Sequence, residues 1–261
     1  MQIGFVGAGR MGGPMVARLA HAGHRVCVLA RSDEKRSAII ELGAEPVADL
    51  AAVAVGAEAV VVCVFTDEQV QQVCRELPAA MPDGSLLILH TTGSPRTAQR
   101  IADEHPHLHV LDAPVSGGPH DIAAGRVTLF VGGPAETVAA AQPVLGSYGD
   151  PVLHVGPLGG GQTVKLINNA MFAAQIGVVA EGARIGKSLG VCEADLFAAL
   201  AHGSSSSKVL EMIGRAGSAD GFIAAVGEFV GKDVAVVRST AAALGADLGR
   251  LESIVDSGLG R

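Results

Sequence analysis

A glycine-rich turn near the start of the chain has the residue types and spacing that suit phosphate binding. Residues 7–12 (GAGRMG) follow an apolar run and open an amphipathic stretch. Glycines at these positions permit a tight turn, a close approach of pyrophosphate to the backbone, and close packing of helix on strand. The N–H groups and partial positive charge of a helix N-terminus attract phosphates. The turn therefore predicts a dinucleotide site, with a glycine-rich turn that binds no ligand as the alternative. The expected contacts are Gly7, Ala8, Gly9, Arg10, Met11 and Gly12.

The end of the second apolar run indicates which dinucleotide to expect. A site for NAD usually carries Asp or Glu there, to bond the ribose hydroxyls. This chain has Arg31 and Ser32 instead. A guanidinium fork and a hydroxyl suit a 2′-phosphate. The prediction is NADP bound by Arg31 and Ser32, with NAD still possible. Asp33 is left as either a helix cap or a ribose ligand.

A second glycine segment follows a later apolar run. Residues 112–118 read DAPVSGG. The Ser116 hydroxyl and the backbone N–H groups of Gly117 and Gly118 can hold a small carboxylate. Ligands of doubly wound sheets bind at the carboxyl ends of strands. We therefore expect Ser116, Gly117 and Gly118 to bind substrate, with a purely structural turn as the alternative.

A lysine and an asparagine four residues apart complete the candidate chemistry. Lys165 and Asn169 follow the glycines of residues 159–161 and lie among apolar neighbours. On a helix, residues four apart share a face. A lone lysine is normally a solvated surface group, but here the glycines and the amide accompany it. An ammonium can stabilise and protonate the oxygen formed when a carbonyl accepts a hydride. Lys165 is therefore the predicted acid/base.

The elements that must position these residues alternate over the first part of the chain. Apolar runs predict strands, and amphipathic runs between several of them predict helices. Alternation of this kind indicates a mostly parallel, doubly wound sheet of the Rossmann type. The expected strands are residues 2–6, 25–30, 59–65, 85–89, 108–111, 127–131 and 152–155, and the expected helices include 11–22, 34–42 and 95–104.

The pattern becomes entirely helical after the glycines of residues 159–161. Helices are expected at 162–189, 193–201 and 229–244, with a short terminal helix; residues 203–207 and 217–221 are expected to be loops. A glycine-rich hinge at such a change of pattern marks a domain boundary. The predicted division is a dinucleotide-binding domain of residues 1–158 and an all-helical domain of residues 159–261, for substrate binding and oligomerisation.

Composition excludes several function classes. The net charge of −7 and an aromatic content of 3% argue against nucleic-acid binding, which needs basic surfaces and stacking side chains. The longest purely apolar run is far shorter than a membrane span. No basic and apolar leader precedes the first strand. The expectation is a cytoplasmic protein that binds no nucleic acid and no membrane.

Cysteine and histidine spacing gives no sign of a metal site. The four cysteines lack CxxC spacing and are expected to be buried, inert thiols. His105, His107 and His109 are split by a proline, and we interpret them as a polar loop. His120, beside the second glycine segment, is expected to be a loop residue in solvent, with substrate contact as the alternative. No metal is expected.

Together these motifs resemble the β-hydroxyacid dehydrogenase family, over nearly the whole chain. The resemblance rests on GxGxxGxxM at residues 7–15, DAPVSGG, GxGxxxKxxxN and the pair Lys232-Asp233. It implies that residues 116–118 bind substrate, Lys165 catalyses, Asn169 holds the substrate, and Lys232 lies near the cofactor. Thr91 and Thr92 resemble the family's cofactor-contacting pair. The strand end at Val64, Phe65 and Thr66 is also assigned to the cofactor.

One departure from the family pattern concerns the substrate site. Asp121-Ile122 stand where the family usually has Gly-Ala. A negative charge there, near a site for a carboxylate, means either that Asp121 points outward or that the substrate is less acidic.

The prediction is an NADP-dependent hydride transfer involving a small β-hydroxy acid or its semialdehyde. Two alternatives remain: an imine reductase of the same superfamily, against which Lys165 argues, and a non-catalytic NADP-binding protein. The helical domain suggests a homodimer or homotetramer.

Overall fold

The structure is a computed structural model that describes residues 1–259. Over this range the chain divides into two compact units, residues 1–165 and residues 166–261, of which the last two residues are not described. The predicted division after residue 158 falls just before helix α8 (Gly160–Ser188), whereas the compact units divide within that helix.

Nine strands of the described chain form one sheet in the first unit, in the order β3-β2-β1-β4-β5-β6-β8-β7, with β9 paired to β8. The six strands from β3 to β6 are parallel, which is the doubly wound order expected of a dinucleotide-binding sheet. β8 runs antiparallel to β6 and β7. The strands are β1 Gln2–Val6, β2 Arg25–Leu29, β3 Glu45–Val47, β4 Ala59–Val62, β5 Leu86–Leu89, β6 His109–Asp112, β7 Val115–Ser116, β8 Val127–Gly132 and β9 Gly149–Gly156.

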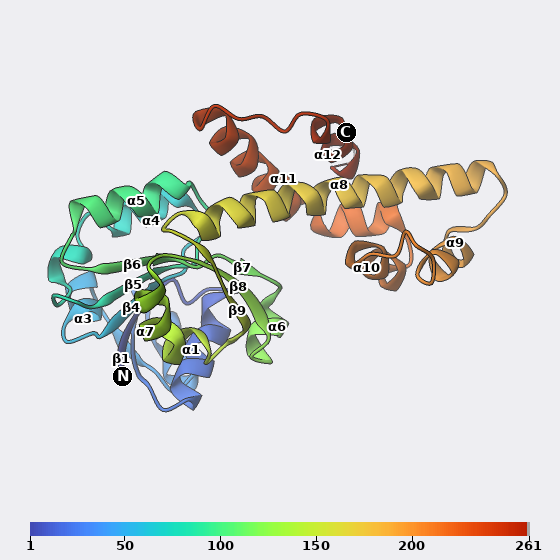
Figure 1. Ribbon diagram of the computed structural model, residues 1–261. Coiled ribbons are helices and arrows are strands. Elements are labelled where there is room, and N and C mark those ends of the chain that lie inside the picture. The colour runs from blue at the N-terminus through green and yellow to red at the C-terminus, as the bar shows by residue number, and fades with distance from the viewer. Residues whose placement is uncertain (260–261) are drawn as a thin grey trace. The chain divides into compact units, whose positions relative to one another are not determined.

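Helices cover both faces of this sheet (Figure 1). The continuous apolar runs supply both faces, because successive side chains of a strand point to opposite sides. In β4, Val61 belongs to the buried cluster that includes residues of α1, α2, α6 and α7, and Val60 belongs to the cluster that includes residues of α3, α4 and α5. The helices of the first unit are α1 Gly12–His21, α2 Asp33–Glu41, α3 Leu50–Ala54, α4 Asp67–Val73, η1 Pro78–Ala80, α5 Pro95–Glu104, α6 Pro119–Ala123 and α7 Ala135–Leu145.

The described part of the second unit is entirely helical, as predicted. Its core is apolar, with buried Ile176, Phe197, Ile213 and Val234 contributed by different helices. The second unit contains most of α8. The helices that follow it are α9 Glu193–Leu200, α10 Lys208–Ala216, α11 Ala219–Ala243 and α12 Leu251–Gly258.

Some local predictions are wrong. β3, β7 and α10 were not foreseen, because three-residue and two-residue strands are too short for a periodic pattern, and α10 lies between two small-residue segments. Residues 217–221 are not all loop, since α11 starts at Ala219, with Ser218 as its cap. His120 lies within α6. Cys192 is exposed, as the cap of α9.

One helix of the described chain, α8, is long and apolar enough to cross a membrane by length and composition alone. A core helix of a soluble protein passes the same test. α8 contributes Ala173 and Ile176 to the core of the second unit.

Candidate active site

The glycine turn after β1 has the geometry that a dinucleotide phosphate requires. Gly7 has φ +101°, and a Cβ there would collide with the Cys63 carbonyl in the loop after β4. A Cβ at Gly12 would stand 2.8 Å from the Phe5 ring. A Cβ at Gly9 would meet nothing within 4 Å, so the backbone faces open space at the start of α1. These residues fit a pyrophosphate laid against the helix N-terminus.

The loops that follow β1, β4 and β5 lie at one edge of the sheet, because these strands are parallel neighbours. The Thr91 hydroxyl donates to the Val64 carbonyl at 2.9 Å and ties two of the loops together. Thr66 caps α4 by a capping box with Gln69, which ties the end of the loop to the helix. Phe65 is 60% exposed. Val64, Phe65, Thr66 and Thr91 thus belong to the same edge as the glycine turn, along with the neighbouring Thr92.

Arg31 and Ser32 lie in the loop between β2 and α2 and have different surroundings. Arg31 is exposed, directly after the buried Ala30. The Ser32 Oγ accepts from the Lys35 backbone N–H at 3.4 Å and caps α2. Asp33 is the first residue of that helix, so the cap is Ser32 and not Asp33. The exposed Arg31 guanidinium offers charged donors to a 2′-phosphate, and the Ser32 hydroxyl, whose oxygen accepts the capping bond, still has its O–H to donate.

A buried carboxylate fixes the start of α8, the helix that carries Lys165. Asp112 Oδ1 accepts from the Gly159 N–H at 2.7 Å, and Oδ2 accepts from the Gln162 N–H at 2.6 Å. Burial raises the pKa of the Asp112 carboxyl above its ordinary value, although these N–H bonds oppose the shift. A carboxylate at a helix N-terminus satisfies otherwise unpaired donors and the helix dipole.

The Gln162 side chain ties the same helix start to the loop after β5. Its Nε2 donates to the Thr91 carbonyl at 2.8 Å, and its Oε1 accepts from the Gly93 N–H at 2.9 Å. Gln162 is 3% exposed. Together with Asp112, it fixes the first turn of α8 to the ends of β5 and β6. Lys165, half-buried, follows one turn later and is the last residue of the first unit.

A buried histidine, His90, connects the end of β5 to the segment that follows β6. His90 Nδ1–H donates to the Ala113 carbonyl at 2.5 Å, and Nε2 accepts from the Tyr148 hydroxyl at 2.7 Å. Burial lowers the pKa of His90 to about 4, against the opposing hydrogen bond to Ala113. The neutral ring thereby holds the start of the DAPVSGG segment beside the end of β5.

Asp121 changes which backbone N–H donors the second glycine segment, residues 116–118, can present to a ligand. The Gly118 N–H donates to Asp121 Oδ2 at 2.8 Å, at the start of α6, where Gly118 is the N-cap. The Gly118 N–H, which is predicted to bind substrate, therefore already has an acceptor within its own segment. Asp121 points back over the glycines and not outward, because an acidic residue three positions after a helix cap can reach back to the cap N–H.

The remaining predicted residues lie in the second unit. Asn169, on α8, is 6% exposed, and its Nδ2 donates to Asp233 Oδ2 at 2.9 Å. Lys232 precedes Asp233 on α11 and is half-buried. The acidic neighbour therefore orients the Asn169 amide within its own unit.

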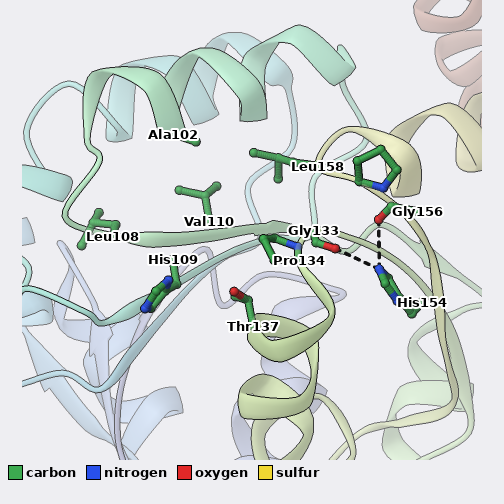
Figure 2. Close-up of a pocket in the computed structure, with 11 residues that line it drawn as sticks. Ala102, Leu108, His109, Val110, Gly133, Pro134, Thr137, His154, Gly156 and Leu158 are labelled. Carbon is green, nitrogen blue, oxygen red and sulfur yellow. Dashed lines mark hydrogen bonds between the residues drawn. The ribbon is translucent and has the colours of Figure 1, made fainter.

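A pocket of about 530 Å³ lies elsewhere, between α5 and α7 beside β6 (Figure 2). His154 Nε2 contacts the Gly133 and Gly156 carbonyls there, at 2.9 and 3.1 Å. None of the predicted site residues lines it. Its lining is Ala102, Leu108, His109, Val110, Gly133, Pro134, Thr137, His154, Gly156, Pro157 and Leu158. Within residues 1–259, no group of three His, Cys, Asp or Glu side chains is arranged to hold a metal.

Three positioning residues were not singled out from the sequence: His90, Asp112 and Gln162. A signal existed for Asp112, a charged residue that ends an apolar run, since a buried charge needs partners. His90 follows LLIL in the same way. Nothing in the sequence indicated that Gln162 would bond to the loop after β5.

Comparisons with known proteins agree with this architecture. Residues 2–156 match the family model described as the NAD binding domain of 6-phosphogluconate dehydrogenase. Residues 159–255 match the model described as NAD-binding of NADP-dependent 3-hydroxyisobutyrate dehydrogenase.

Individual relatives are similar over most of their length. A 3-hydroxyisobutyrate dehydrogenase of Pseudomonas aeruginosa is 34% identical over 80% of this chain and 72% of the relative. An NAD-dependent L-serine dehydrogenase of the same organism is 32% identical over 78% and 70%. The solved structure of Mycobacterium tuberculosis 3-hydroxyisobutyrate dehydrogenase with L-serine has a TM-score of 0.89 at 27% identity, covering 98% of this chain and 91% of that one.

The fold, the glycine turn and these matches define a nicotinamide-dependent oxidoreductase. More narrowly, the chain belongs to the β-hydroxyacid dehydrogenase family, as its motifs predict.

Proposed function

We propose that this protein transfers a hydride between NADP and a small β-hydroxy acid or its semialdehyde, with Lys165 as general acid/base. The observation that carries this is the anchored start of α8, where Asp112 and Gln162 fix the turn before Lys165 to the carboxyl edge of the sheet. Relatives named for 3-hydroxyisobutyrate and L-serine support the substrate class.

The cofactor preference rests on Arg31. Its exposed guanidinium follows β2, where an acidic residue would favour NAD. Charge-assisted hydrogen bonds contribute roughly 1.5–3 kcal/mol each, which corresponds to a preference of about tenfold to a hundredfold for NADP. Among the named relatives, one is described as NAD-dependent and one family model as NADP-dependent, so Arg31 is the residue that argues for NADP here.

The chemistry of each side chain indicates its part in the proposed reaction. When bound, the nicotinamide supplies or takes up the hydride. In the reductive direction, the Lys165 ammonium stabilises the carbonyl oxygen and gives it a proton. In the oxidative direction, the neutral Lys165 amine takes the hydroxyl proton. The Ser116 hydroxyl and the Asn169 amide orient the substrate.

A substrate panel tests the proposal. The protein is mixed with NADPH and small semialdehydes or cyclic imines, and with NADP and the matching hydroxy acids, and absorbance of the reduced nicotinamide is followed. Turnover of semialdehydes and hydroxy acids supports the proposal. Turnover of imines alone would favour an imine reductase, and cofactor binding without turnover would favour a non-catalytic protein.

We also propose a cytoplasmic homodimer or homotetramer, with no nucleic-acid or membrane partner. Support for assembly comes from α8, where Ile167, Met171, Val178 and Ile185 are 47–59% exposed on one side of the helix. Exposed apolar rows of this kind are typical of surfaces that a partner covers. Sedimentation velocity measures the oligomeric state.

A further inference from the structure

We propose that Asp121 makes the segment of residues 116–118 favour a hydroxy acid that also carries an ammonium group over one that carries a carboxylate alone. This inference rests on the proposed function, because it assumes that the segment faces the substrate. It narrows the substrate class to amino-bearing hydroxy acids, of which serine is the simplest example.

The carboxylate of Asp121 covers both glycines of the segment. Its Oδ2 accepts from the Gly118 N–H at 2.8 Å. A Cβ built on Gly117 would stand 2.8 Å from the same oxygen. The Asp121 N–H donates back to the Gly118 carbonyl at 3.0 Å, so both ends of the contact are fixed by the backbone. The position that a substrate carboxylate would occupy above Gly118 therefore already holds a carboxylate.

This arrangement reverses the charge preference of the segment. A substrate carboxylate would lose the Gly118 donor and would meet a negative charge at close range. The Asp121 side chain is 31% exposed, and a carboxylate that accepts one or two hydrogen bonds can accept more. An ammonium on the substrate can therefore use the oxygens that repel a carboxylate. His120 Nε2 lies 3.3 Å from Oδ2, the same oxygen that accepts from Gly118, and the His120 side chain is 82% exposed.

Two matched substrates isolate this effect. L-Serine and 3-hydroxypropionate differ only in having an ammonium or a hydrogen on the carbon next to the carboxylate. We expect the wild-type protein to have the higher kcat/KM for L-serine. In Asp121→Asn, which keeps a hydrogen-bonding side chain but removes the charge, the ratio of the two kcat/KM values should fall about tenfold to a hundredfold. In Asp121→Gly, which frees the Gly118 N–H, the KM for 3-hydroxypropionate should fall as well.

Asp83→Asn is the matched control, because it removes one exposed carboxylate far along the chain from the segment. It should keep the wild-type ratio. A wild-type preference for 3-hydroxypropionate would overturn the inference, as would a ratio that neither Asp121 variant changes; either result leaves the proposed hydride transfer standing.

Absence of turnover with both compounds in every variant, and with every other hydroxy acid and semialdehyde of the substrate panel, would instead contradict the proposed function. Calorimetric titration of the same two compounds into the NADP-saturated protein then decides the role of Asp121 separately. L-Serine that binds more tightly than 3-hydroxypropionate to the wild type, but not to Asp121→Asn, supports the inferred role of Asp121. Equal binding in wild type and variant, including no binding to either, overturns it.

Discussion

At the scale of single residues, several polar side chains of the described site are paired with backbone groups of a neighbouring segment. Thr91 bonds to the loop after β4, and Asp121 bonds to the segment it follows. Side chains held in this way lose little further freedom when a ligand binds, which favours affinity and rate. Arg31 and Lys165 are the two residues whose proposed roles depend on the residue type itself.

Lys165→Ala should lower kcat by about 10²–10⁴-fold, because a positioned acid/base group contributes that much. NADPH binding, measured by fluorescence titration, should stay close to wild type, since the glycine turn and the loops after β4 and β5 are unchanged. A variant with near-normal turnover would remove Lys165 from the mechanism.

Arg31→Ala should raise the KM for NADPH by about tenfold to a hundredfold, because the proposed charge-assisted bond to the 2′-phosphate would be lost. The KM for NADH should change little. Steady-state kinetics with both cofactors measures the difference. Equal effects on NADPH and NADH would contradict the assignment of Arg31.

At the scale of elements, the described site depends on the start of one helix. α8 begins against the ends of β5 and β6, where Asp112 and Gln162 receive or supply its first hydrogen bonds. The glycines of residues 159–161 serve this contact, since a Cβ on Gly161 would stand 2.8 Å from the Asp112 carbonyl oxygen. Helix α8 is therefore positioned by strand ends that lie far away in sequence.

Asp112→Asn should destabilise the protein by roughly 1–3 kcal/mol, because an amide group would face one of the two buried N–H donors and leave it unpaired. It should also lower kcat more than it raises the KM for cofactor, since the turn before Lys165 loses its anchor. Urea unfolding and steady-state kinetics measure the two effects.

Asp49→Asn is the control for this substitution. Asp49 caps α3 at an exposed position through the Ala52 N–H, and Asn caps a helix about as well as Asp. A loss of stability and activity in Asp49→Asn as large as that in Asp112→Asn would contradict the argument.

At the scale of the whole molecule, stability should depend on pH through His90. Its folded pKa of about 4 lies below the unfolded value near 6.5, so the unfolded chain binds a proton first as the pH falls. The contribution of neutral His90 to the free energy of unfolding is complete above about pH 6.5 and is lost progressively as the pH falls toward 4. Between pH 7 and pH 4.5 the loss should be on the order of 2–3 kcal/mol.

His90→Gln tests this dependence. The amide can still donate to Ala113 and accept from Tyr148, but it does not titrate. Urea unfolding followed at several pH values should show a flatter profile between pH 7 and pH 4.5 for the variant. Parallel profiles for variant and wild type would show that another group carries the acid sensitivity.

Much of the fold could be predicted from the sequence, because its signals are local. The glycine turn, the buried strands such as β1 and β4, and the helices α5 and α9 depend on periodicity and turn chemistry within a few residues. The two-residue β7 and the helix α10 could not be found in this way, since pairing and packing create them.

By itself, the sequence determined the family, the doubly wound sheet and the residue types available for chemistry, because motifs and apolar periodicity are properties of the chain alone. Only the tertiary structure decided which polar groups are already satisfied. It shows that Ser32 is a cap, that Asp112 holds α8 and that Asp121 occupies the Gly118 donor. Hydrogen bonding depends on distance and direction in space, and chain spacing alone does not determine either.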